Sequence, residues 1–260
     1  MNFIDGEILY VDKPLGWTSF DAVKRTRGAI LRRLFLRKIK VGHAGTLDPL
    51  ATGVMILTTG RATRRIEELQ AGIKEYVATI ALGATTPSFD LETEIDATYP
   101  TEHITEELVA ETLKRFTGRI EQIPPAFSAI KIGGKRAYEY ARKGRDPELK
   151  PKILVIDEIE MLSFSPTSIT LRIVCSKGTY IRALARDIGA ALGSGGHLTA
   201  LRRTRVGDVT IDQCLSVQEL ADKIANAPVE WPDDYEIPQA FIKHNEATDD
   251  ASSHLASTES

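Results

Sequence analysis

Residues 42–53 read Gly-His-Ala-Gly-Thr-Leu-Asp-Pro-Leu-Ala-Thr-Gly, and the apolar run from Val54 to Leu57 follows directly. This composition is typical of a shaped loop that leads into a buried strand, because glycine adopts positive φ or admits a second chain at close range. Pro49 fixes its own φ and moves Asp48 away from the α region. The loop therefore holds one carboxylate in a stiff frame. Asp-Pro between glycines is also an ordinary turn, so this stretch alone leaves both interpretations open.

The segments around this loop alternate between extended and helical patterns. Alternating or continuous apolar residues predict strands over residues 7–11, 54–58, 75–82, 152–164 and 168–175. Apolar spacing near 3.6 residues predicts helices over residues 20–34, 104–118 and 181–192. A short helix is expected over residues 136–142, and a capping box at residues 216–219 predicts a final helix from 216 onward. Because these elements show no regular βα rhythm, we expect an α+β fold with a mixed, mostly antiparallel sheet flanked by helices.

The first predicted helix precedes the loop at residues 42–53. Thr18 or Ser19 can cap it. Its core-facing side is predicted to be an apolar stripe with a period near 3.6 residues, formed by Phe20, Val23, Ile30 and Leu34. Arginines and lysines occupy its other faces.

Composition limits the class of protein. The chain has 260 residues, of which 42% are hydrophobic, enough for a sizeable core. No apolar run approaches the roughly 20 residues that span a bilayer, and residues 1–5 do not resemble a signal peptide. We therefore expect a soluble, cytoplasmic protein without membrane contact. Cys175 and Cys214 lie far apart without metal-ligand spacing, so we expect reduced, buried thiols and no metal site.

Charge is distributed unevenly along the chain. The formal net charge is only -3. Residues 24–40 nevertheless contain no acid and eight basic residues: Lys24, Arg25, Arg27, Arg32, Arg33, Arg37, Lys38 and Lys40. Such a run can form separately solvated helix faces or one positive face for a polyanion. Its length without an acid favours nucleic acid as the partner.

The carboxylates do not fit a common hydrolase. Glycosidic hydrolysis usually needs two carboxylates flanking the bond, whereas the opening loop offers only Asp48; Asp90 and Asp187 are the other candidates, and neither lies in a comparable motif. Gly193-Ser194-Gly195 follows a predicted helix, unlike a nucleophile elbow. A phosphate-binding loop and a zinc motif are absent from the sequence. One carboxylate can still act as nucleophile or base when the product stays bound.

Six sequence blocks, in order over residues 6–207, resemble the bacterial tRNA pseudouridine synthase family called TruB. They are Gly6 with residues 13–19 (Lys-Pro-Leu-Gly-Trp-Thr-Ser), residues 41–54 around Asp48, residues 74–76 (Lys-Glu-Tyr) with 82–86, residues 122–131 (Gln-Ile-Pro-Pro-Ala-Phe-Ser-Ala-Ile-Lys), residues 175–182 (Cys-Ser-Lys-Gly-Thr-Tyr-Ile-Arg) and residues 201–207. Any one block could arise by chance. Six in the right order make the resemblance specific.

The resemblance implies a pseudouridine synthase fold with a central active-site cleft. It implies that the protein isomerises a uridine in the T-loop of tRNA, at position 55, to pseudouridine by base flipping. Asp48 would be the catalytic residue, attacking C1′ or removing a ribose proton, and the sequence does not choose between these routes. Because the reaction occurs within one bound nucleotide, no cofactor, metal or second substrate is expected.

The other site residues are carried over from the resemblance position by position. Tyr76 is expected to stack on the flipped uracil, although from its strand alone core packing is favoured. Arg182 is expected to pair with Asp48 and keep it ionised.

The resemblance implies supporting roles for five further residues. His43 is expected to contact the T-loop, and Tyr180 and Leu201 to line the base pocket. Lys13 and Pro14 are expected to brace the Asp48 loop.

The expected organisation is a catalytic domain over residues 1–215, a short helical extension over 216–242 and a polar, disordered tail over 243–260, without a complete C-terminal RNA-binding domain. We expect a monomer that binds the tRNA T-arm and needs no obligate protein partner. The alternative is an RNA-binding or tRNA-folding protein in which Asp48 is only structural.

Overall fold

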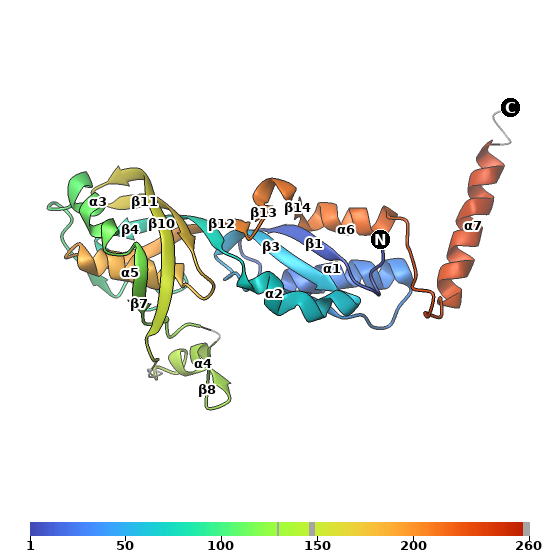
Figure 1. The fold of residues 1–260 in the computed structure, drawn as a ribbon, viewed down its shortest axis with the longest axis horizontal. Helices are drawn as coiled ribbons and strands as arrows, with labels where there is room; N and C mark the ends of the chain where they lie inside the picture. Colours follow the sequence, from blue (N-terminus) through green and yellow to red (C-terminus); the bar gives the residue numbers. More distant parts are fainter. Residues whose placement is uncertain (129, 146–148, 257–260) are drawn as a thin grey trace. The chain divides into compact units, whose positions relative to one another are not determined.

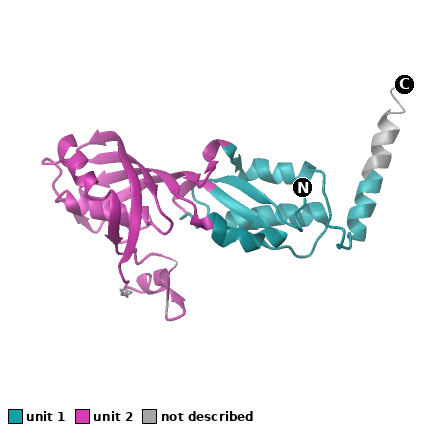
Figure 2. Cartoon of the chain, in the orientation of Figure 1, with its two compact units in different colours: residues 1–48, 55–69, 213–260 teal, residues 49–54, 70–212 magenta. Residues whose placement is uncertain are grey.

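The computed structural model describes residues 1–128, 130–145 and 149–256. The chain forms two compact units (Figure 2). Unit 1 comprises residues 1–48, 55–69 and 213–260, and unit 2 comprises residues 49–54 and 70–212. Each unit therefore draws on segments that are far apart in sequence, and the chain passes from unit 1 to unit 2 within the loop at residues 42–53, between Asp48 and Pro49.

Unit 1 contains a small mixed sheet. Its strands are β1 (Ile8–Lys13), β2 (Val41–His43), β14 (Leu215–Ser216) and most of β3 (Ala51–Thr59) (Figure 1). Their order is β14-β1-β3, with β2 on β3. β1 pairs with β14 in parallel, and β2 pairs with β3 antiparallel.

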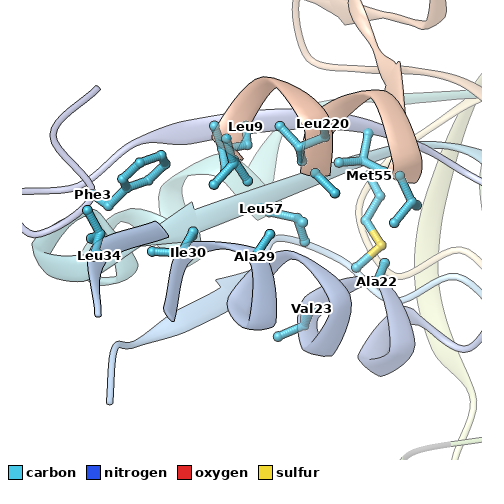
Figure 3. Close-up of a cluster of buried hydrophobic side chains, with 14 of the residues drawn as sticks. Phe3, Leu9, Ala22, Val23, Ala29, Ile30, Leu34, Met55, Leu57 and Leu220 are labelled. Carbon is cyan, nitrogen blue, oxygen red and sulfur yellow. The ribbon is translucent and has the colours of Figure 1, made fainter. Parts of the chain in front are cut away.

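The helices of unit 1 are α1 (Ser19–Leu34), α6 (Val217–Asn226) and α7 (Gln239–Ala256), with the 3-10 helix η1 (Gly60–Arg65) and α2 (Ile66–Ala71) after β3. α1 and α6 contact each other along their lengths. Both bury their apolar faces in one cluster with the strands, which includes Phe3, Leu9, Ile30, Leu57 and Leu220 (Figure 3). This cluster is the core that supports β3.

α1 follows the predicted pattern except at its first turn. Thr18 is the N-cap and forms a capping box with Asp21. Val23, Ile30 and Leu34 are buried as predicted, but Phe20 is 66% exposed, so its assignment to the core was wrong. The physical reason is that Ser19 begins the inward-facing stripe instead, because its hydroxyl is bonded inside unit 1.

Unit 2 contains the larger, mostly antiparallel part of the same sheet. Its strand order is β12-β4-β11-β10-β7, and residues 51–53 of β3 pair with β12 in parallel. These strands are β4 (Lys74–Leu82), β7 (Gly118–Gln122), β10 (Lys152–Ser165), β11 (Ser168–Cys175) and β12 (Gly196–Val206), with β13 (Val209–Thr210) also on β12. The predicted α+β class with a mixed, mostly antiparallel sheet is confirmed.

Unit 2 also contains helices and two short ribbons. α5 (Ile181–Ala191) contacts β12 and β4, and buries Ile181, Leu184 and Ile188 as its spacing predicts. The other elements are α3 (Glu106–Lys114), α4 (Ala137–Ala141), the 3-10 helix η2 (Ile211–Gln213), and two ribbons, β5 (Ala84–Thr85) with β6 (Ala97–Thr98) and β8 (Lys131–Ile132) with β9 (Lys135–Arg136).

The C-terminal segment contains α7, and the disordered tail expected from the sequence over 243–260 stays a prediction. α7 continues to Ala256, and residues 257–260 lie outside the described residues. The start of α7 is held because Phe241 is buried in the core of unit 1, where its ring meets Trp231 edge-on and Arg33 lies over it. The proposed domain boundary at residue 215 stays a prediction.

Across the described ranges, no helix combines the length and apolar character needed to cross a membrane. Within the same ranges, histidine, cysteine, aspartate and glutamate form no group of three that could hold a metal ion. Cys175 is buried and Cys214 half-buried, and neither forms a disulfide.

Candidate active site

Hydrogen bonds from Ser19, the first residue of α1, fix the Asp48 loop. The Ser19 hydroxyl donates to the carbonyl of Leu47 at 2.9 Å and accepts from the Leu47 amide at 2.8 Å. Both residues are buried. Ala44 donates to the Ile56 carbonyl at 2.9 Å, which ties the start of the loop to β3. The residue before Asp48 is therefore fixed at both backbone polar groups, and Asp48 itself is half-buried.

Lys13 organises the segment that leads into α1. Its side chain is fully buried, and Nζ donates to the carbonyls of Pro14 at 2.9 Å and Trp17 at 2.6 Å. A buried ammonium needs such acceptors to offset its lost hydration. Since Ser19 follows two residues after Trp17, this closed turn places the residue that holds the Asp48 loop. The contacts agree with a supporting role for Lys13 and Pro14.

The far end of the loop depends on a glycine. Gly53 has φ +108°, and a Cβ there would lie 2.1 Å from the Arg203 carbonyl oxygen of β12. Arg203 is buried, and its Nε donates to the Val54 carbonyl at 2.8 Å. Any side chain at position 53 would separate β3 from β12. The sequence predicts that a second chain segment can come close to this glycine, and in the structure that segment is strand β12.

Two predicted base-pocket residues share a face of the unit 2 sheet. Leu201 of β12 is opposite Ala78 of β4, and Arg203 is opposite Tyr76. Opposed residues in an antiparallel pair point to the same side, as do residues two apart on one strand. Tyr76 and Leu201 therefore lie diagonally on one face. Tyr76 is 8% exposed, so much of its ring is packed.

Arg182 lies at the start of α5 and is 5% exposed. Its Nη1 donates to the Ser88 carbonyl at 3.1 Å and its Nη2 to the Phe127 carbonyl at 2.8 Å. Its Nε is 3.5 Å from Oδ2 of Asp90, which is also buried. Arg182 thus joins α5 to two loops of unit 2. Asp48 belongs to unit 1, and the predicted pairing of Arg182 with Asp48 stays a prediction.

Tyr180 is the N-cap residue of α5 and is half-exposed. The buried side chain of Gln122 brackets its backbone: Oε1 accepts from the Tyr180 amide at 2.9 Å, and Nε2 donates to the Tyr180 carbonyl at 3.1 Å. These two hydrogen bonds position Tyr180 where α5 begins, next to the end of β7. It also gives a physical reason for the glutamine that opens the block at residues 122–131.

Burial shifts the pKa values of two neighbouring side chains, at the first residue of β4 and the last residue of β11. Lys74 and Cys175 are register partners in β4 and β11. Burial, with a contribution from the charge of Arg203, lowers the pKa of Lys74 to about 8. Burial raises the pKa of the Cys175 thiol to about 11. Cys175 is therefore a protonated, unreactive thiol at neutral pH, as expected from its place in the core.

Residues 32–181 match the family described as "TruB family pseudouridylate synthase (N terminal domain)", and residues 182–235 match the "tRNA pseudouridylate synthase B C-terminal domain". The chain belongs to the TruB family. It is similar to proteins named tRNA pseudouridine synthase B: 66% identical over 93% of this chain and 99% of the protein from Phocaeicola vulgatus, and 51% over 83% and 94% for Flavobacterium johnsoniae.

Solved structures show the same fold. The chain resembles one in a "Cbf5-Nop10-Gar1 Complex", with a TM-score of 0.62 and 29% identity over 85% of this chain and 55% of that one. It also resembles one in an archaeal "box H/ACA sRNP Nop10-Cbf5 complex", with a TM-score of 0.60, 28% identity and coverage of 86% and 55%. This TruB-family chain spans about half the length of those chains. The pseudouridine synthase fold implied by the sequence blocks is confirmed.

Within this TruB-family chain, each unit brings together part of the predicted site. Unit 1 contains Lys13, Pro14, His43 and Asp48; His43 is the last residue of β2, opposite Leu57 of β3. Unit 2 contains Tyr76, Tyr180, Arg182 and Leu201. The individual catalytic and binding roles stay predictions.

Sequence reasoning missed several positioning residues. The sequence marks Ser19 as a helix cap and as the end of a family block, and Gln122 as the start of another block, but it does not show which backbone groups they bond. The pairing of Asp90 with Arg182 joins residues 92 positions apart and has no local signal. Arg182 and Arg186 are four residues apart on α5, and this spacing does not reveal that Arg182 is buried. The signal in the sequence that could have marked Gln122 is its place as the polar first residue of a family block.

Proposed function

We propose that this protein isomerises a uridine in the T-loop of tRNA, at position 55, to pseudouridine. The observation that carries the proposal is the 66% identity over 93% of the chain to a protein named tRNA pseudouridine synthase B. The physical features of the Asp48 loop support it, because the loop offers one framed carboxylate for a reaction that needs no second acid. The partner is tRNA, bound through its T-arm.

The proposed chemistry starts with the target nucleotide flipped out of its stack. Asp48 assists cleavage of the bond between N1 of uracil and C1′ of ribose, by attack on C1′ or by removal of a ribose proton. The detached uracil turns and forms a bond from C5 to C1′, and the proton leaves C5 for N1. Substrate and product are isomers, so the step is balanced without an external reactant.

The other roles are proposed for residues that support or surround Asp48. Tyr76 stacks on the uracil, with Leu201 beside it on the same sheet face and Tyr180 at the pocket wall. Arg182 pairs with Asp48 and favours its ionised form. His43 contacts the T-loop, and Lys13 and Pro14 support the catalytic loop. We propose further that the protein works in the cytoplasm as a monomer.

Asp48→Asn tests the catalytic assignment because it removes the charge and keeps the shape. Unmodified tRNA is incubated with wild type or variant, and pseudouridine is mapped by chemical labelling. Wild type is expected to modify the T-loop uridine, whereas Asp48→Asn gives no detectable product while binding tRNA with unchanged affinity. An unchanged product yield from the variant would show that Asp48 is structural.

Tyr76→Leu belongs to the same experiment and separates stacking from core packing. Loss of turnover with a retained melting temperature supports stacking on the base. A melting temperature that falls together with activity assigns the ring to packing, consistent with its low exposure. Wild-type protein that binds tRNA without forming pseudouridine would favour the alternative of an RNA-binding or tRNA-folding protein.

A further inference from the structure

A basic hollow lies on α1, outside the site described above. It has a volume of about 700 Å³. Its lining comprises Gly16, Trp17, Asp21, Lys24, Arg25, Arg27, Gly28, Leu31 and Arg32, all within unit 1. The four cationic side chains are exposed. The hollow therefore combines a concave shape with a concentration of positive charge.

These cations differ from the arginines that are paired with carboxylates. Arg61, Arg65, Arg142, Arg172, Arg186 and Arg205 each form a salt bridge with a carboxylate. In the ranges that the structure describes, Lys24, Arg25, Arg27 and Arg32 form none. Arg25 donates instead to the neutral amide of Gln218 at 2.8 Å. The charge of the hollow is thus left available to a ligand.

Asp21 is the one carboxylate in the lining, and it is engaged by the helix cap. Its Oδ2 accepts from the Thr18 amide at 2.9 Å and from the Thr18 hydroxyl at 2.6 Å. These bonds hold the pKa of Asp21 below its usual range. One capped carboxylate against four cations leaves the hollow with net positive charge.

Gly28 lies in the middle of the lining and is not explained by packing. Glycine is a poor residue for a helix interior, because it loses the most backbone entropy on folding. A Cβ at position 28 would meet only Nη1 of the flexible Arg32 side chain, at 3.4 Å. Neither a neighbouring element nor a positive φ requires glycine here. Its effect is to leave a dip in the helix surface between the cations.

α1 also connects this hollow to the catalytic loop. Ser19, the first residue of α1, holds the residue before Asp48, and Gly28 follows nine residues later. At 1.5 Å rise per residue the two positions are about 14 Å apart along the helix. A polyanion that occupies the hollow therefore binds the same unit as Asp48 but at a separate place.

We propose that the basic hollow on α1 binds the phosphodiester backbone of tRNA away from the flipped nucleotide. Phosphate groups would lie over Gly28, where no side chain blocks them, between Arg27 and Arg32. This inference rests on the proposed function and adds a second contact surface for the same substrate. The contact supplies affinity through charge neutralisation, and it does not take part in the chemical step.

The double variant Arg27→Gln/Arg32→Gln tests the proposal through its salt dependence. Initial rates of pseudouridine formation on unmodified tRNA are measured over a range of tRNA and KCl concentrations. KM is expected to rise, kcat to stay unchanged, and the slope of log KM against log salt to fall by about 1.4 to 1.8, since each lost phosphate contact removes about 0.7 to 0.9. The matched control Arg65→Gln/Lys114→Gln removes the same charge from two cations that are paired with Glu68 and Glu111, and its slope should not change.

Gly28→Leu provides a second test, because it should stabilise the protein and at the same time weaken tRNA binding. Leucine favours the helix, so the melting temperature should rise, while its side chain fills the dip and raises KM for tRNA severalfold. A KM and a salt slope equal to those of wild type in both hollow variants would overturn the proposal. Wild-type protein that forms no pseudouridine would instead overturn the proposed function, so the two failures are distinguishable.

Discussion

At the scale of single residues, Arg182 has an observed structural role and a proposed role in the site. It is buried, donates to two backbone carbonyls and lies beside Asp90. Removing one partner of a buried ion pair leaves an uncompensated charge, which typically costs about 3–5 kcal/mol. The same side chain is proposed to pair with Asp48. A variant of Arg182 alone therefore cannot separate structural support from a part in the reaction.

A double variant separates the two roles of Arg182. Arg182→Met should lower the free energy of unfolding by about 3–5 kcal/mol and abolish pseudouridine formation, because Asp90 stays buried and charged. Adding Asp90→Asn removes that charge and should recover part of the stability but none of the turnover. Urea unfolding and product mapping measure both effects. Turnover that returns together with stability would limit Arg182 to a structural role.

At the scale of elements, α1 supports the Asp48 loop. Two adjacent hydroxyls begin the helix and do different things. Thr18 caps α1 by accepting from the Asp21 amide, whereas Ser19 bonds both backbone groups of Leu47. The first interaction is local and exposed. The second is buried and joins residues 28 positions apart, so only the second transmits order to Asp48.

Ser19→Ala and Thr18→Ala form a matched pair that tests this distinction. Ser19→Ala leaves two buried backbone groups without their partner, which should cost about 1–3 kcal/mol and lower kcat because the loop before Asp48 loosens. Thr18→Ala loses only the cap, at about 1 kcal/mol, and should keep kcat. Thermal unfolding and pseudouridine formation rates report the outcome. Equal kcat values for the two variants would argue against a role of Ser19 in positioning the loop.

At the scale of the whole molecule, the chain crosses between its two units several times. The core of unit 1 takes residues from the N-terminal segment, from β3 and from α6, which follows all of unit 2 in sequence. α6 contributes Val217, Leu220, Ala221 and Ile224 to that core. Neither unit is therefore a continuous piece of sequence, and the Asp48 loop depends on residues that come last.

Truncation tests this dependence. A chain that ends at residue 212 lacks α6, and losing a buried leucine or isoleucine alone typically costs about 2–5 kcal/mol. Several such losses match the whole stability of about 5–15 kcal/mol of a domain, so unit 1 should unfold and pseudouridine formation should cease.

Hydrogen exchange of the α1 amides reports the state of unit 1 in this truncated chain. A control chain that ends at residue 247 keeps every side chain described in that core, and it should retain α1 protection and activity. If the α1 amides stay protected from exchange in the shorter chain, unit 1 does not need α6 to fold.

Local pattern in the sequence was sufficient for much of the fold. Period-2 alternation predicted β4 and β11, helical spacing behind a cap predicted α1, and a capping box predicted α6, because these signals depend on neighbours a few residues apart. The family blocks also located Asp48 and its candidate partners. The error at Phe20 arose because helical spacing cannot choose between adjacent residues at the edge of a stripe.

Only the tertiary structure decided how distant segments meet. The parallel pairing of residues 51–53 with 201–203 requires the absent side chain of Gly53, and the burial of Arg182 requires two loops and Asp90. Ser19 becomes a loop support only when Leu47 reaches it. The sequence by itself determined which residues are candidates for the chemistry, through their type and motif. The tertiary structure decided what holds them, because backbone pairing and buried hydrogen bonds join residues with no local relation.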